Sequence, residues 1–85
     1  MKLARKLLRI REALRLTQGE LIDKLRFDES VKQQHVSAWE KGLREPDLFS
    51  LINYARAVNV CLEVLVDDSF DLPLELPPKK VYHRH

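Results

Sequence analysis

The sequence predicts a small all-α domain, and three observations lead to this fold class. Apolar residues recur at helical spacing in several short segments, two segments begin with helix-capping signals, and three of the four prolines lie after residue 72. Eighty-five residues with one cysteine allow a single hydrophobic core and no internal disulfide. The chain has no apolar run near the roughly 18 residues of a membrane helix and no signal-peptide pattern. We therefore expect a cytoplasmic protein without a membrane partner.

Five helices are expected, and the first two have clear patterns. In the first, over about residues 2–15, apolar residues recur at i, i+4, i+7 and i+11 and form one stripe. The members of this stripe are Leu3, Leu7, Ile10 and Leu14. The basic residues Lys2, Arg5, Lys6 and Arg9 lie mostly off the stripe, so we expect them on the solvated surface. The second helix, over about residues 18–26, begins with a capping box formed by Thr17 and Glu20.

The third helix, around residues 31–41, is the central segment of the chain, and the other helices are expected to position it. Ser30 and Gln33 have the spacing of a second capping box, and Gly42 supplies a stop. Val36, Trp39 and Leu43 share one face, which we expect to be buried. The other face carries hydrogen-bonding side chains and no core residues, namely Gln33, Gln34, Ser37 and Lys41. Such a face is suited to an external partner.

Two further helices are expected to close the core, over about residues 48–58 and 62–66. Pro46 disfavours helix at the residue before it, and Asp47 can cap the fourth helix. The residues of these helices that we expect to be buried are Leu48, Leu51, Ile52, Ala55, Val58, Leu62 and Leu65. Phe27 is expected in the core and Tyr54 as a partly buried ring.

After residue 66 the pattern changes, because apolar and polar residues alternate and prolines exclude a helix. The chain is thus divided into a helical domain, residues 1–66, and an acidic, proline-containing arm with a basic tail, residues 67–85. Within the arm, residues 67–78, one side carries Phe70, Leu72, Leu74 and Leu76. Two arrangements are open: the arm folds back onto its own domain, or it lies on a second subunit as a dimerisation strap. The last seven residues, 79–85, are expected to be disordered.

Charge is distributed unevenly along the chain. Residues 1–44 hold eleven Lys/Arg and six Asp/Glu, whereas residues 45–78 hold one Arg and seven acids. Residues 79–85 add three basic side chains. This asymmetry is typical of a protein that presents one face to a polyanion, and it is equally compatible with an ordinary solvated surface.

Three groups of residues, in the right order, resemble the Cro/C1-type helix-turn-helix (XRE) family of phage and bacterial repressors. They are Leu16-Thr17-Gln18-x-Glu20-Leu21, then Val36-Ser37-x-Trp39-Glu40-x-Gly42-x-Arg44-x-Pro46, then Leu51-x-x-Tyr54-Ala55-x-x-Val58-x-Val60. The resemblance covers about residues 5–66. It implies a five-helix, lambda-repressor-like DNA-binding domain whose third helix enters the major groove of double-stranded DNA.

The resemblance also implies which residues contact DNA. Gln33 and Gln34 stand where the family reads bases, and a glutamine amide can bond adenine N7 and N6 together. Gln18, at the start of the second helix, corresponds to a phosphate contact. The other candidates are Ser37, for a base or a phosphate, and Lys32, Lys41 and Arg44, for the DNA backbone. Arg11 and Glu40 resemble a family salt bridge that joins the first helix to the third.

The chain departs from the family pattern in two places. Between Leu25 and Val36 it has about four residues more than the usual family spacing, and the glycine common in that turn is missing. The extra residues either lengthen the turn or extend the third helix backwards to Ser30. Cys61 stands where the family often has a capping serine, and we interpret it as a small buried hydrophobe rather than a redox sensor.

These features predict a sequence-specific, DNA-binding transcriptional regulator, a repressor that acts as a homodimer. The alternative is an antitoxin or another protein-interaction module that keeps the fold and binds a protein partner through the 67–78 arm. The histidines and Cys61 do not have the spacing of zinc ligands. The sequence shows neither a nucleophile with its base and orienting residue nor a phosphate-binding glycine loop. We therefore expect no enzyme, no metal site and no cofactor.

Overall fold

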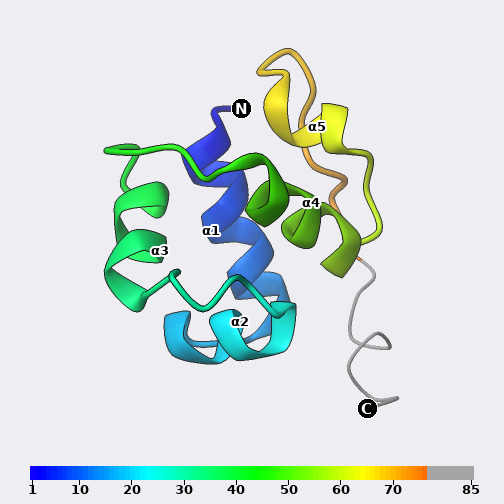
Figure 1. Cartoon of the computed structure of the whole chain (residues 1–85). Coiled ribbons are helices and arrows are strands. Elements are labelled where there is room, and N and C mark those ends of the chain that lie inside the picture. Colours follow the sequence, from blue (N-terminus) through cyan, green and yellow to red (C-terminus); the bar gives the residue numbers. More distant parts are fainter. Residues whose placement is uncertain (77–85) are drawn as a thin grey trace.

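The structure of the protein, a computed structural model, describes residues 1–76, and these residues form five α-helices without a β-strand (Figure 1). The helices are α1 (Leu3–Leu14), α2 (Gln18–Leu25), α3 (Gln33–Glu40), α4 (Leu48–Ala57) and α5 (Leu62–Val66). The predicted all-α fold and its five helices are confirmed. Helices α3 and α5 lie on opposite sides of the domain, with α1 and α4 between them. The expected disorder of residues 79–85 falls outside the described residues.

Residues next to the short helices determine where they begin and end, and the sequence predicts some of these residues. The capping box of α2 is confirmed: the Glu20 N–H donates to Thr17 Oγ1 at 3.1 Å, and the Thr17 N–H donates to a Glu20 carboxylate oxygen at 2.9 Å. Helices α1 and α2 end at residues in the left-handed region, Arg15 with φ 59° and Arg26 with φ 57°. Gly42, with φ 75°, follows α3 and confirms the predicted stop.

Three aromatic rings from three different segments form the centre of the core. Ring centroids are 5.8 Å apart for Phe27 and Trp39, 5.3 Å for Phe27 and Tyr54, and 6.3 Å for Trp39 and Tyr54. These separations are favourable for aromatic pairs. The prediction of a partly buried Tyr54 is wrong, because the other two rings pack on it and leave it fully buried. The predicted α1 stripe is confirmed as part of the core, with Leu3 only partly buried at its start.

The connection between α2 and α3 shows where the extra residues lie: they lengthen the turn, and α3 begins only at Gln33. The predicted capping box of Ser30 with Gln33 is wrong. The Ser30 N–H and hydroxyl both donate to the Asp28 carboxylate, so Ser30 closes a local turn. Phe27 and Val31 are 8% and 9% exposed and anchor the turn in the core. Because Val31 is anchored in the core as part of the turn, α3 starts after it.

Two residues predicted in the core lie on the surface between α3 and α4. Leu43 is 73% exposed, because α3 ends at Glu40 and the chain turns at Gly42, so helical spacing no longer carries Leu43 to the buried face. Leu48, the first residue of α4, is 56% exposed, and Phe49 after it is 76% exposed. The other predicted core residues of α4 and α5 are buried or partly buried, namely Leu51, Ile52, Ala55, Val58, Leu62 and Leu65.

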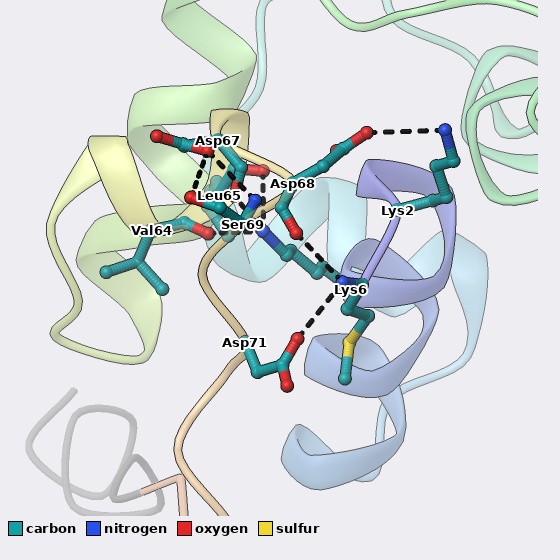
Figure 2. A network of polar contacts seen from close by, with 9 residues as sticks. Lys2, Lys6, Val64, Leu65, Asp67, Asp68, Ser69 and Asp71 are labelled. Atoms are coloured by element: carbon teal, nitrogen blue, oxygen red, sulfur yellow. Dashed lines mark hydrogen bonds and ion pairs between the residues drawn. The ribbon is translucent and has the colours of Figure 1, made fainter.

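Lys6 is fully buried, so its prediction as a solvated residue of α1 is wrong. Its ammonium group donates to the carbonyl oxygens of Val64, Leu65 and Asp67, at 2.6, 3.3 and 2.9 Å (Figure 2). The last carbonyls of a helix lack partners within the helix and carry partial negative charge, which a lysine can satisfy. The periodicity of α1 alone could not indicate that α5 would end against this side chain.

The arm folds back onto its own domain over the described residues, which is the first of the two arrangements that the sequence left open. Leu72 is 4% exposed and belongs to the core, and Leu76 packs against the core while remaining partly buried. Phe70 is 45% exposed and Leu74 is 94% exposed. The four apolar residues therefore do not share one environment, since two of them turn inwards and two turn outwards.

Polar contacts at the beginning of the arm tie it to the start of α1 (Figure 2). The Met1 amino group donates to the Asp68 carbonyl and to the Asp71 carboxylate, each at 3.0 Å, and Lys2 Nζ lies 3.4 Å from the Asp68 carboxylate. The Met1 amino group lowers the pKa of Asp71. Exposed pairs of this kind contribute little to stability. We infer that buried Lys6 and Leu72 hold the arm more strongly than the exposed pairs do.

Cys61 is exposed, so its prediction as a buried hydrophobe is wrong. It occupies the N-cap position of α5 and makes no side-chain capping hydrogen bond. An N-cap residue lies outside the first helical turn, and here that position faces solvent.

We expect Lys6→Met to lower the free energy of unfolding by about 1–3 kcal/mol, because three carbonyl oxygens lose a buried donor. Arg5→Met is the matched control, since Arg5 is exposed on the same helix and its replacement should stay within about 0.5 kcal/mol. Urea unfolding followed by circular dichroism measures both variants. Equal stabilities for the two variants would show that the Lys6 contacts do not hold the arm.

Candidate nucleic-acid interface

Helix α3 has a buried side and an exposed side, as its sequence predicts. Val36 and Trp39 are 0% and 6% exposed and face the core, where α3 packs against α1 and α2. The exposed side begins with Gln33 and Gln34 and continues to the partly exposed Ser37. No core side chain covers these amides, so they are available to a partner.

An ion pair fixes α3 to α1. The Arg11 guanidinium donates to both carboxylate oxygens of Glu40, with Nε–Oε2 at 2.7 Å and Nη2–Oε1 at 3.0 Å. A third donor, Arg11 Nη1, bonds the Leu16 carbonyl at 3.1 Å, just before α2. The two charged side chains are 20% and 6% exposed. This two-point contact is the predicted pair, and the hydrogen bond that Arg11 donates to Glu40 raises the pKa of Arg11.

The same carboxylate orients a row of amides that leads to the exposed side of α3. Gln18 Nε2 donates to Glu40 Oε1 at 3.0 Å, so the oxygen of the Gln18 amide is directed elsewhere. That oxygen lies 3.5 Å from Gln33 Nε2, at the outer limit of a hydrogen bond. A charged acceptor therefore selects one orientation of the Gln18 amide. The structure brings together two predicted site residues that are distant in sequence.

The remaining predicted site residues flank α3. Lys32 is the N-cap residue and Lys41 the C-cap residue, and both side chains are exposed. Arg44 is also exposed, two residues beyond the left-handed Gly42. The cationic side chains thus lie at both ends of the helix that presents the amides. This arrangement allows contact with a backbone of phosphates on either side of a base-reading helix.

His35 has a structural role at this interface that sequence reasoning missed. Its Nδ1 accepts the backbone N–H of Lys32 at 2.8 Å, which satisfies one of the free donors at the start of α3. The hydrogen bond requires an unprotonated Nδ1, so the ring hydrogen of the neutral imidazole lies on Nε2. The position is that of the Glu or Gln in a capping box, three residues after the N-cap. Histidine is not one of the residues of that pattern. The only feature of the sequence that could have indicated this role is that His35 follows Lys32 by three residues.

Helix α2, the lengthened turn and α3 together form a helix-turn-helix unit, supported on α1 and closed by α4 and α5. Residues 7–65 match the family model of the helix-turn-helix domains of the Cro/C1 type (XRE). The chain belongs to this family. Membership implies DNA binding, typically by a transcriptional regulator, and the domains of this family are generally not enzymes. No curated protein and no solved structure matched the chain.

Within residues 1–76 no group of three or more His, Cys, Asp or Glu residues is arranged to hold a metal ion. Among the same residues, none of the helices combines the length and the apolar character needed to cross a membrane.

We expect His35→Ala to lower the free energy of unfolding by about 1 kcal/mol, because the Lys32 N–H loses its acceptor at the start of α3. His35→Gln should restore most of this loss, since glutamine is a usual capping-box residue at this position. Thermal or urea unfolding measures the stability of the two variants. Similar stabilities of the two variants, both below that of the unchanged chain, would contradict the capping role.

Proposed function

We propose that this protein is a sequence-specific, double-stranded DNA-binding transcriptional regulator, a repressor that reads the major groove with α3. The observation that carries the proposal is the exposed pair of amides at the start of α3, one of which lies beside the oriented amide of Gln18. The helix that presents them is held by a largely buried ion pair rather than by flexible surface contacts. Such preorganisation is suited to reading bases.

Gln33 can contact an adenine and keep its contact with the Gln18 amide. Its Nε2 carries two hydrogens, one directed to Gln18 and one free, and its Oε1 is an unused acceptor in the contacts described. Adenine offers N7 as an acceptor and the N6 amino group as a donor in the major groove. The remaining hydrogen and Oε1 match these two groups. Gln34 is exposed next to it and can read the neighbouring base pair.

The other predicted site residues are proposed to bind phosphates. The backbone N–H groups at the start of α2 favour an anion, and Gln18 is the first residue of that helix. Lys32, Lys41 and Arg44 supply positive charge around α3, and Ser37 can donate to a base edge or a phosphate. The charge distribution agrees, since the basic half of the chain contains α3 whereas the acidic half contains α5 and the arm.

A helix of eight residues reaches only a few base pairs, so we propose that two copies act together. In helix-turn-helix dimers the two recognition helices meet half-sites about 34 Å apart, one turn of DNA. A homodimer on such a two-fold operator would cover the DNA from one side and exclude other proteins. Repression is the regulatory effect that this mode of binding supports most directly.

A second candidate function is a protein-interaction module, such as an antitoxin, that uses the arm. The observation in its favour is the outward face of the arm, where Phe70 is 45% exposed and Leu74 is 94% exposed. The acidic side chains of this segment are Asp67, Asp68, Asp71 and Glu75. An apolar surface with acidic neighbours suits a basic protein partner and repels DNA. This function does not require the amides of α3.

Gln33→Ala and Gln34→Ala should each reduce the discrimination between selected and random DNA by about 1–3 kcal/mol, because each removes hydrogen bonds to base edges. Duplexes would first be selected from a randomised pool with the unchanged full chain. Fluorescence anisotropy, titrated with salt and with random DNA as competitor, then measures each variant.

Lys32→Ala is the contrasting control, since it removes a charge and no base contact. It should weaken binding to all duplexes alike and reduce the slope of log affinity against log salt by about 1. If the two glutamine variants discriminate between selected and random DNA as well as the unchanged chain does, Gln33 and Gln34 do not read bases. A folded chain that binds no DNA at low salt would instead favour the protein-interaction function.

A further inference from the structure

The lengthened turn between α2 and α3 carries a carboxylate, that of Glu29, which forms none of the salt bridges within residues 1–76. Phe27 and Val31 anchor the turn in the core, so they are not available to a partner. Ser30 donates its N–H and its hydroxyl to the Asp28 carboxylate, so these two side chains bind each other. Glu29 lies between the two anchors and is exposed. Its carboxylate is therefore free to accept hydrogen bonds from an external partner.

Glu29 lies on the same groove as the start of α3. The groove runs between α2 and the turn, and it is lined by Glu29 from the turn and by Lys32 and Gln33 from the start of α3. In Figure 1 the turn runs back along α2 before it reaches α3. Gly19 lines the groove from α2, and a Cβ atom added to it would meet no other atom within 4 Å. Glu29 thus shares an open surface with the two residues at the start of α3.

We propose that Glu29 is a third base-reading residue, which accepts a hydrogen bond from the N4 amino group of a cytosine beside the base pair that Gln33 reads. The inference rests on the proposed function, because it requires α3 to enter the major groove. The first residues of a recognition helix are the ones that contact base edges. A side chain that shares a groove with those residues lies at the flank of the bases that they read.

The chemistry of a carboxylate favours cytosine over the other three bases. An ionised carboxylate only accepts hydrogen bonds. In the major groove guanine presents two acceptors, N7 and O6, and thymine presents the acceptor O4, so both would repel it. Adenine presents its N6 amino group beside the acceptor N7, whereas the amino group of cytosine has no acceptor beside it on the same base. Glu29 would therefore act both by binding cytosine and by rejecting the alternatives.

Two cations on the same groove reduce the cost of bringing a carboxylate close to DNA. Arg26 and Lys32 line the groove together with Glu29, and both are exposed. They offset the repulsion between the carboxylate and the phosphates of the duplex. Asp23 also lines the groove, but it belongs to α2 and not to the turn that leads into α3. Asp23 therefore has the same charge in the same groove without the proposed base contact.

The test compares Glu29→Gln with Asp23→Asn in the full chain. Each variant removes one negative charge from the groove and keeps nearly the same shape. Both residues are exposed, so both variants should fold, and thermal unfolding followed by circular dichroism checks this. The duplexes selected with the unchanged chain are then resynthesised with each of the four base pairs at a single position. Fluorescence anisotropy measures the affinity of each variant for each duplex.

The unchanged chain should prefer cytosine at a position next to the base pair whose preference Gln33→Ala removes. In Glu29→Gln this preference for cytosine should fall about tenfold, because an amide can donate as well as accept and no longer rejects the other bases. The preferences at the other positions should remain. Asp23→Asn should keep the preferences at every position, and both variants should bind random DNA at least as well as the unchanged chain.

The possible failures can be told apart. The inference is overturned if Glu29→Gln keeps every base preference, if Asp23→Asn loses the same preference, or if the preference that Glu29→Gln loses is for another base. Selected duplexes without a cytosine beside the position read by Gln33 would also overturn it. If Gln33→Ala and Gln34→Ala lose discrimination while Glu29→Gln does not, only this inference fails. A folded chain that selects no sequence contradicts both the inference and the proposed function.

Discussion

The ion pair of Arg11 with Glu40 is the contact on which the rest of the structure depends. It joins α1 to α3 at two points, and a third donor of the same guanidinium reaches the carbonyl of Leu16, two residues before α2. One carboxylate oxygen also receives the Gln18 amide, which lies beside Gln33. Loss of either charge would leave the other largely buried and without its ion-pair partner, which is costly. The pair therefore links stability to the orientation of the exposed amides.

Charge is used differently at the other end of the domain. Lys6 is buried against the end of α5 and is satisfied by backbone carbonyl oxygens, so no carboxylate is needed there. The acidic side chains that follow remain exposed on the arm, and α5 lies on the opposite side of the domain from α3 (Figure 1). This separation keeps the negative charges of the arm away from the side proposed to meet phosphates. A protein with a small net charge can thus still present a basic face.

The lengthened turn before α3 shows how a departure from a family pattern can be absorbed. Its two apolar residues, Phe27 and Val31, enter the core, and the polar residues between them form a local turn on Asp28. The cost is that the expected serine can no longer cap α3. His35 takes over part of that function from within the helix. The position of α3 is thereby kept, although the chain that leads into it is longer.

The sequence by itself determined the fold class, the five helices and the α2 capping box, because these depend on residues a few positions apart. It also predicted the Arg11–Glu40 pair and brought the glutamines of α3 to attention, through the resemblance to the family. Tertiary structure alone decided the burial of Lys6, the inward turn of Leu72 and the exposure of Leu43, Leu48 and Cys61. The burial of Lys6 and Leu72 depends on which distant segment packs against each residue, whereas the exposure of Leu43 and Cys61 depends on where α3 ends and α5 begins. Hydrophobic spacing records the period of one helix and contains no information about its neighbours.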